Sequence, residues 1–291
     1  MEKIKIKFTD FWPEFDPKDN IFYNNLLKIC RPEISNSPQI LFYSDFGRDH
    51  LRYACFKISY TGENKRPNYK HCDYAFSSDF DTDRNTRLPL YALYTDVREL
   101  LRPKDPGKII SQKNKFCCFL VSNDSCETRN NFFTKLSQYK KVDSGGKYFN
   151  NIGFRVKDKL DFIKDYKFVI AFENASWPGY TTEKIFEPML VNSIPLYWGN
   201  PRVELDFNTR SFINYYDFNS FDAMIERIIE VDRNDQLYLK YLGEPWFRDN
   251  KLNEFVGEER LIGILKFVIE QSNRKNKLSS FLRAAKYRML S

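Results

Sequence analysis

The sequence predicts an α/β protein in which strands and helices alternate through the C-terminal two thirds of the chain. Continuous apolar runs such as Phe168–Phe172 are typical of strands that are buried on both faces. Stretches with helical spacing follow such runs, as at 129–139. Residues 168–199 contain the pattern strand, polar loop, helix and strand. This alternation indicates a parallel sheet covered by helices on both faces.

Short, aromatic-rich strands and turns are predicted for the first third of the chain. The expected strands are 3–8, 39–44, 53–59 and 73–77, and helical periodicity is present at 20–29 and 89–101. Residues 1–8 alternate polar and apolar side chains, which is typical of a half-buried first strand. They lack the apolar core of a signal peptide.

The segment 102–108, Arg-Pro-Lys-Asp-Pro-Gly-Lys, predicts a linker because it combines Pro, Gly and charge. A length of 291 residues suits one large domain or two ordinary ones, and the break at 102–108 favours two. We therefore expect an N-terminal domain over 1–110, a second domain over 111–272 and a basic tail over 273–291.

The second domain is expected to follow the strand–helix rhythm. The predicted strands are 116–122, 168–172, 194–198 and 212–214, and the predicted helices are 129–139, 159–165, 181–192, 220–231 and 253–272. No apolar run reaches the roughly 18 residues of a membrane span.

The positive charge of the chain is concentrated in its tail. Residues 273–291 hold six basic and no acidic side chains, so the rest of the chain carries only +1 of the net +7. A nucleic-acid groove would spread basic residues over the body of the protein, and we exclude that class. The tail is either an amphipathic helix that binds an anionic membrane surface or a solvated terminus.

Cysteine usage indicates a reducing compartment. The six cysteines are Cys30, Cys55, Cys72, Cys117, Cys118 and Cys126. None forms a Cys-x-x-Cys pair, and His50 and His71 are the only histidines. Neither a structural zinc site nor a disulfide framework is expected. We expect buried thiols and a cytoplasmic protein, peripheral on the inner face of the membrane if the tail binds there.

Polar side chains gather where the strand 168–172 ends and the next helix begins. They are Glu173, Asn174, Tyr180, Thr181, Thr182, Glu183 and Lys184. The N-terminus of a helix carries partial positive charge and attracts an anion, and Lys184 adds a full charge there. This pattern favours a site for a phosphate or diphosphate; the alternative is an ordinary solvated first turn.

Three other motifs could carry chemistry. Arg129 opens the helix after the strand 116–122 and is either a phosphate ligand or a surface arginine. Glu63, in Tyr-Thr-Gly-Glu-Asn, is a candidate general base, although such turns are common. Asp79-Phe-Asp-Thr-Asp83 could hold a divalent cation, but Arg84 and Arg87 follow it, so a solvated turn is favoured.

Taken together, these motifs resemble the α-1,3/4-fucosyltransferases of glycosyltransferase family 10, particularly the bacterial members. The matching blocks are Tyr60–Asn64 with Pro67-Asn68, Arg87–Tyr91, Val121–Asn123 with Arg129-Asn130, Phe172–Asn174, Gly179–Lys184, Ile194–Gly199 and Asp206–Asn208. They lie in most of residues 58–220. The first 50 residues give no such match, and we expect acceptor specificity to depend on them.

The resemblance implies a GT-B fold with two Rossmann-like domains facing a central cleft, the second binding GDP-fucose and the first an oligosaccharide acceptor. It implies an inverting transfer with Glu63 as the catalytic base and no essential metal or other cofactor. The residues implied to bind GDP-fucose are Ser122, Asn123, Arg129, Asn174, Tyr180, Glu183 and Lys184. The expected product is a Lewis-type α-1,3-fucosylated glycan. Alternatives are a GT-B enzyme with another donor or acceptor, and a non-catalytic nucleotide- or glycan-binding protein.

Overall fold

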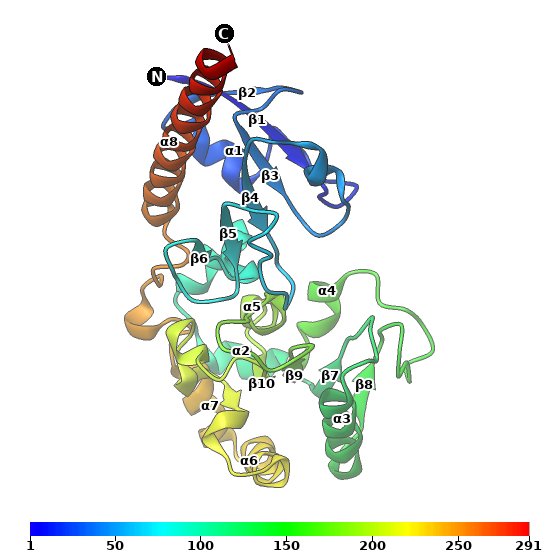
Figure 1. Cartoon of the computed structure of the whole chain (residues 1–291). Coiled ribbons are helices and arrows are strands. Elements are labelled where there is room, and N and C mark those ends of the chain that lie inside the picture. The colour runs from blue at the N-terminus through cyan, green and yellow to red at the C-terminus, as the bar shows by residue number, and fades with distance from the viewer. Residues whose placement is uncertain (291) are drawn as a thin grey trace. The chain divides into compact units, whose positions relative to one another are not determined.

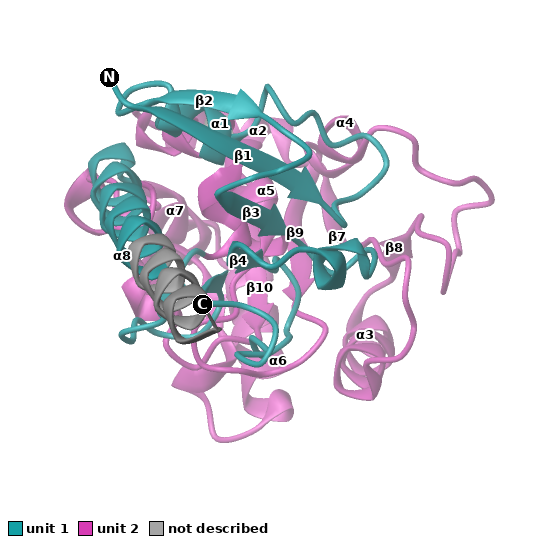
Figure 2. Cartoon of the chain, turned by 45° about the horizontal axis from the view of Figure 1, so that its top comes forward, with its two compact units in different colours: residues 1–88, 257–291 teal, residues 89–256 magenta. Residues whose placement is uncertain are grey.

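The computed structural model describes residues 1–290, without the side chains of Thr95 and of residues 276–290. The chain forms two compact units (Figure 2). Unit 1 comprises residues 1–88 and 257–291, and unit 2 comprises residues 89–256. Each unit is built around its own sheet.

Unit 1 is a parallel sheet with the strand order β2-β1-β3-β4-β5-β6 (Figure 1). Its elements are β1 (Lys3–Thr9), α1 (Ile21–Leu26), β2 (Arg31–Ile34), β3 (Ile40–Tyr43), β4 (Phe56–Tyr60), β5 (Tyr74–Ser77), β6 (Asn85–Arg87) and α8 (Glu258–Leu290). Along β1, side chains alternate between exposed and buried, as predicted. The chain goes from β1 to β2 on one side and then to β3 on the other, so the strand order reverses between β1 and β3.

Unit 2 is a second parallel sheet, with the order β11-β10-β9-β7-β8. Its helices and strands are α2 (Pro106–Gln112), β7 (Lys115–Phe119), α3 (Glu127–Tyr139), β8 (Val142–Ser144), α4 (Lys159–Ile163), β9 (Tyr166–Phe172), α5 (Glu183–Leu190), β10 (Ile194–Trp198), β11 (Ile213–Asn214), α6 (Phe221–Arg233) and α7 (Asp235–Gly243). Here the order reverses between β7 and β9. Such a reversal opens a crevice at the carboxyl ends of the strands, where α/β proteins bind ligands.

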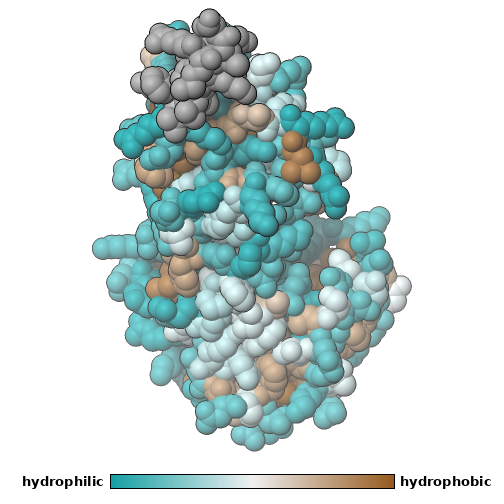
Figure 3. Space-filling model, in the orientation of Figure 1, coloured by the Kyte–Doolittle hydropathy of each residue, from teal (hydrophilic) through white to brown (hydrophobic). Residues whose placement is uncertain are grey.

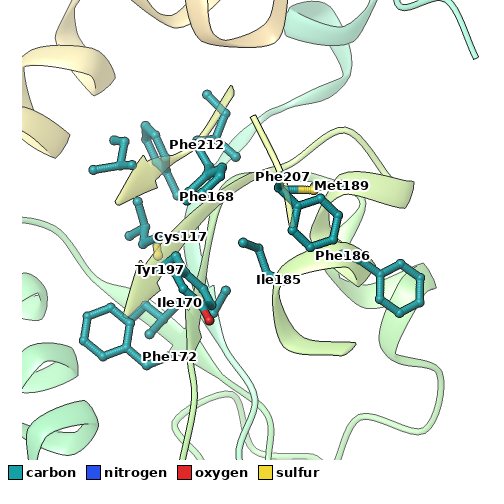
Figure 4. Close-up of a cluster of buried hydrophobic side chains, with 14 of the residues drawn as sticks. Cys117, Phe168, Ile170, Phe172, Ile185, Phe186, Met189, Tyr197, Phe207 and Phe212 are labelled. Carbon is teal, nitrogen blue, oxygen red and sulfur yellow. The ribbon is translucent and has the colours of Figure 1, made fainter. Parts of the chain in front are cut away.

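The core of unit 2 confirms that its sheet is covered on both faces. Cys117 of β7 lies in the large apolar cluster with α3, α5 and α6, whereas its neighbour Cys118 packs with α4. Successive strand residues point to opposite faces, so both faces are buried. Figure 4 shows Ile185 of α5 in one cluster with Phe168 and Ile170 of β9. All six cysteines are unpaired, and five are buried.

The strands that the sequence did not predict lie at sheet edges, and the α-helices that it did not predict are α2 and α7. β2 contains Pro32, β6 is Asn-Thr-Arg and β8 is Val-Asp-Ser, so none shows the apolar alternation of a strand. Sheet edges tolerate Pro and polar residues because one side of the strand is unpaired. Helix α7 follows α6 directly, and Asn234 caps its N-terminus by accepting a hydrogen bond from the Leu237 N–H.

The predicted linker at 102–108 is wrong, because Asp105 caps α2 and Pro106 occupies its first turn. Pro is favoured there, since its missing N–H would be unpaired anyway. The segment 89–101 forms two short 3-10 helices, Leu90–Leu93 and Thr95–Leu101, instead of one α-helix. Tyr91, Val97 and Leu100 join the core of unit 2, so this unit begins earlier than the expected limit at 110.

The helix expected at 253–272 begins at Glu258 and belongs to unit 1, where α8 contacts α1 and β4 (Figure 1). Lys275 anchors its C-terminal part through an ion pair of 2.6 Å with Asp73. Most side chains of the expected tail, 273–291, lie outside the described residues. Within the described part, no helix is long and apolar enough to cross a membrane. The face in Figure 3 is mainly hydrophilic, with scattered apolar side chains.

Candidate functional site

The strand reversal in unit 2 brings together the polar residues that the sequence singled out. Arg129 lies in the first turn of α3, which follows β7. Asn174 and the loop leading to α5 follow β9. Because β7 and β9 are parallel neighbours, both loops leave the same edge of the sheet.

A buried carboxylate organises the start of α5. Glu173 is 0% exposed. One of its oxygens accepts the Thr182 N–H at 2.8 Å, and the other accepts the Thr182 hydroxyl at 2.7 Å. Thr182 is the N-cap of α5, so Glu173 fixes the orientation of the helix N-terminus. The sequence placed Glu173 in the polar segment but assigned it no role.

Gly199 leaves room for this carboxylate. A Cβ at residue 199 would lie 2.3 Å from Cγ of Glu173, and its φ of +153° is rare for residues with side chains. The close approach of the β10 end to the Glu173 side chain therefore requires glycine.

Lys184 lies between two acidic side chains. Its Nζ is 3.3 Å from Oε2 of Glu173 and 3.4 Å from Oε1 of Glu183. Burial would lower the pKa of Lys184, but the two carboxylates outweigh it and raise the pKa, so the ammonium stays charged at neutral pH. Burial would raise the pKa of Glu183, but Lys184 and Lys159 lower it.

The side chains of Lys184 and Glu183 are only 23% and 22% exposed. The alternative of an ordinary solvated first turn is therefore wrong. The helix N-terminus presents a fixed cation and the positive end of the helix dipole at the sheet edge, which favour an anion, while its Thr182 and Lys184 N–H groups are bonded within the protein.

Arg129 is buried, at 2% exposure, so the alternative of a surface arginine is also wrong. Its Nη1 donates to Oδ1 of Asn174 at 2.8 Å, and its Nη2 donates to the Asn123 carbonyl at 2.5 Å. Nε has no hydrogen-bond partner among the described residues. Burial lowers the pKa of Arg129, but a guanidinium keeps its charge in proteins, so an arriving anion would be stabilised here.

A hydrogen-bond network that the sequence did not predict holds the loop between β9 and α5. Asp206 accepts hydrogen bonds from Thr181 at 2.6 Å, from Asn200 at 3.1 Å and from Tyr91 at 2.8 Å. Asn200 also accepts the Gly179 N–H at 2.7 Å. Sequence spacing gives no sign of this network, because Tyr91 and Asp206 are 115 positions apart.

The remaining predicted donor-site residues differ in burial. Tyr180 is buried beside the network, with its N–H donating to the Trp177 carbonyl. Asn174 is half-buried and orients Arg129. Ser122 and Asn123 are exposed, and the contact of Asn123 with Arg129 is through its backbone carbonyl.

The candidate base belongs to unit 1. Glu63 follows β4 and has an exposed side chain. Its backbone N–H donates to the Thr61 hydroxyl at 3.2 Å, and that hydroxyl donates to Asp45 at 2.5 Å. The loop is thus tied down while its carboxylate faces solvent.

The acidic motif at 79–83 is engaged by arginines from elsewhere. Asp79 pairs with Arg66, and both carboxylate oxygens of Asp81 accept from Nη2 of Arg260, at 2.9 and 2.7 Å. In the described part of the chain, no three His, Cys, Asp or Glu side chains converge as a metal site. Arg84, expected to neutralise the motif, donates instead to backbone carbonyls of Tyr69, Cys72 and Asp73.

Comparison with known proteins gives two family matches that together cover most of the chain. Residues 110–276 match glycosyltransferase family 10 (fucosyltransferase), C-terminal part. Residues 6–94 match the N-terminal domain of alpha-(1,3)-fucosyltransferase FucT.

Individual relatives are fucosyltransferases too, in agreement with the two family matches. The chain is 34% identical to alpha-(1,3)-fucosyltransferase FucT of Helicobacter pylori, over 88% of this chain and 62% of that protein. It is 33% identical to mouse 4-galactosyl-N-acetylglucosaminide 3-alpha-L-fucosyltransferase 9, over 50% of this chain and 40% of that protein. The chain therefore spans less than two thirds of either relative.

A solved structure of an alpha1,3-fucosyltransferase with GDP-fucose superposes with a TM-score of 0.78 at 26% identity, covering 93% of this chain and 91% of the other. This match confirms the predicted GT-B type of α/β fold. Because the family matches cover both units and the fold is that of a solved fucosyltransferase, the chain belongs to glycosyltransferase family 10, the fucosyltransferases.

Proposed function

We propose that this protein is an inverting α-1,3-fucosyltransferase that transfers L-fucose from GDP-fucose. The observation that carries the proposal is the presence of two fixed cations, the buried Arg129 and the partly buried Lys184, at the strand reversal of unit 2. Arg129 and Lys184 are held there by Asn174 and Glu173. A diphosphate leaving group needs such fixed positive charge as its bond to the sugar breaks.

The chemistry divides between the leaving group and the acceptor. As GDP leaves, negative charge develops on the β-phosphate, and Lys184, Arg129 and the N-terminus of α5 stabilise it. Glu63 removes the proton of the attacking hydroxyl as the new bond forms. Attack on the face opposite GDP inverts the anomeric carbon. Asn174, Tyr180 and Glu183 line the donor site, with Ser122 and Asn123 beside Arg129.

We propose the 3-OH of N-acetylglucosamine or glucose, in galactosyl-N-acetylglucosamine-type glycans, as the acceptor, giving Lewis-type products. Support comes from the relatives, one of which is a 4-galactosyl-N-acetylglucosaminide fucosyltransferase. A GT-B enzyme with another donor or acceptor is the second candidate. A binding-only protein is disfavoured, because binding alone does not need Glu63.

The test is incubation with GDP-fucose and a panel of galactosyl-N-acetylglucosamine acceptors, with product linkage read by NMR. An α-1,3-linked fucose is expected, and activity should survive EDTA, because protein cations replace a metal at the diphosphate. Transfer from another nucleotide sugar, or none from GDP-fucose, would refute the proposal. Activity abolished by EDTA and restored by Mn²⁺ would refute the metal-independent mechanism.

A further inference from the structure

Unit 1 has its own strand reversal, between β1 and β3, and two side chains join its two loops. Asp10 follows β1, and His50 lies after β3 in the 3-10 helix Asp49–Arg52. The Asp10 carboxylate accepts the Asp49 N–H at 2.9 Å, the His50 N–H at 2.9 Å and a contact from Nδ1 of His50 at 2.7 Å. The sequence alone assigns His50 no role.

The loop geometry is built around this pair. Asp10 adopts a left-handed backbone with φ of 61°, and its side chain is only 4% exposed. A Cβ at Gly47 would lie 2.5 Å from the Asp10 carboxylate, so the loop after β3 can approach Asp10 this closely only with glycine at this position. Burial would raise the pKa of Asp10, but hydrogen bonds from His50 and Asp49 outweigh it and lower the pKa.

An ionised carboxylate can only accept hydrogen bonds, so Nδ1 of His50 must be the donor. In the neutral form of the ring, Nε2 is then an acceptor of fixed orientation. The imidazole also stacks on Tyr43, with ring centroids 4.0 Å apart and planes 10° apart. The ring is therefore held on both an edge and a face.

His50 lines a cavity of about 480 Å³ in unit 1, within the size range of small-ligand sites. Its walls combine donors and acceptors, including Asp45, Thr61, Lys65, Asn68 and His71. Thr61, two residues before Glu63, places the cavity beside the candidate base.

Exposed aromatic side chains lie on the same two loops. Phe46 is 62% exposed, and Trp12 lies 6.2 Å from it between ring centroids, at 70°. Aromatic faces beside hydrogen-bonding groups suit a sugar, which has an apolar face and a polar edge. The cavity lining has mixed charge, with Arg48, Lys65 and Arg66 beside Asp45, so the exposed aromatic rings are the feature that favours a sugar here.

We propose that Asp10 and His50 form a recognition pair for the neutral acceptor glycan: Asp10 positions His50, Nε2 of His50 accepts one acceptor hydroxyl, and Phe46 stacks on a sugar ring. This inference rests on the proposed fucosyl transfer and names the acceptor-selecting residues.

The first experiment measures acceptor and donor KM for Asp10→Asn, His50→Phe and Phe46→Ala. His50→Phe keeps a ring against Tyr43 but removes Nε2. Each variant should raise the acceptor KM by about 10-fold, the scale of one lost hydrogen bond or stacking contact, while the GDP-fucose KM stays within about two-fold. Phe267→Ala, which removes an exposed Phe from α8 of the same unit, should leave both constants unchanged.

A second experiment separates recognition from a structural role. Monodeoxy acceptors, each lacking one hydroxyl, are compared in the native protein and in His50→Phe, with an unchanged circular dichroism spectrum and Tm as the folding check. With the native protein, kcat/KM for one analogue should be about 10-fold below that of the complete acceptor. With the variant, removing the same hydroxyl should lower kcat/KM almost no further. If each analogue loses the same kcat/KM in both proteins, or if the acceptor KM is unchanged in the variants, the proposed recognition pair is refuted.

A third experiment tests the recognition pair even if the proposed fucosyl transfer is wrong. If no fucose is transferred, saturation-transfer NMR with N-acetyllactosamine still tests the pair, because it reports binding without turnover. Binding to the native protein that is lost in His50→Phe supports the inference. Equal binding in both proteins, or none to the native protein, overturns it.

Discussion

At the residue scale, the candidate site depends on charges placed where water reaches them poorly. Lys184 keeps its proton because Glu173 and Glu183 flank it, and Arg129 is buried with two hydrogen-bonded nitrogens and an unpartnered Nε. Buried charges of this kind are costly unless they are paired or used. Lys184 is already paired with two carboxylates, so the group that a diphosphate would satisfy is Nε of Arg129, which has no partner among the described residues.

Glu63→Gln should lower kcat by about 100-fold or more, because the amide cannot take the acceptor proton. GDP-fucose affinity, measured by calorimetry, should stay within a few-fold, since Glu63 lies outside the cationic site. Glu259→Gln, an exposed change in α8, serves as the control. Normal turnover in Glu63→Gln would remove Glu63 from the catalytic step.

Lys184→Met should weaken GDP binding by about 10- to 100-fold, the usual effect of losing a charge-assisted hydrogen bond of about 1.5–3 kcal/mol. Isothermal titration calorimetry with GDP measures the change. Lys135→Met, which removes a half-exposed lysine paired with Asp222, should bind GDP normally. An unchanged Kd in Lys184→Met would exclude Lys184 from the diphosphate site.

At the element scale, loops and helix ends carry the site, and strands only position it. The sequence predicted most of the buried strands because their apolar runs are unambiguous. It missed β2, β6 and β8, where an edge position removes the need for apolar residues on both faces. It predicted a linker at 102–108 because Pro and Gly are common in linkers. Pro is also common in the first turn of a helix, and only the packing distinguishes a linker from a helix start.

Gly199→Ala tests how the end of β10 supports the start of α5. The added methyl would overlap Glu173, which must shift and carry Thr182 and Lys184 with it. We expect a loss of about 1–3 kcal/mol in unfolding free energy, equivalent to a Tm lower by several degrees, together with weaker GDP binding. Differential scanning calorimetry measures the first effect and titration with GDP the second.

The matched control is Gly243→Ala at the end of α7, where a Cβ would meet nothing within 4 Å. Its Tm should change little. A Gly199→Ala protein as stable as this control, with native GDP affinity, would show that the close approach to Glu173 does not constrain the site.

At the scale of the whole molecule, the two sheets share a topology but differ in the side chains at their strand reversals. Each reverses its strand order, and at each reversal an acidic residue orients a basic or aromatic partner: Glu173 with Lys184 in unit 2, and Asp10 with His50 in unit 1. Unit 2 presents Arg129 and Lys184 where a diphosphate would bind, whereas unit 1 presents mixed charges together with exposed aromatic rings, which suit a sugar.

Truncation after Lys275 tests the proposed membrane contact of the tail while keeping the Lys275–Asp73 ion pair. It removes Lys277, Arg283, Lys286 and Arg288, and each basic residue near an anionic surface contributes about 1 kcal/mol. Co-sedimentation with phosphatidylserine vesicles should fall by at least about 10-fold, while activity on soluble acceptors persists. Vesicle binding equal to that of the full chain would show that the tail is no anchor.

The sequence by itself determined the α/β class, most of the buried strands, the family resemblance and the polar segment from Glu173 to Lys184. Local periodicity and motif spacing contain that information, because they depend on neighbouring residues. Only the tertiary structure decided that Arg129 is buried, that Asp206 ties the loop before α5 to Tyr91, and that Asp10 orients His50. These contacts join residues 40 to 115 positions apart or depend on burial, and strand order, which local sequence does not encode, brings them together.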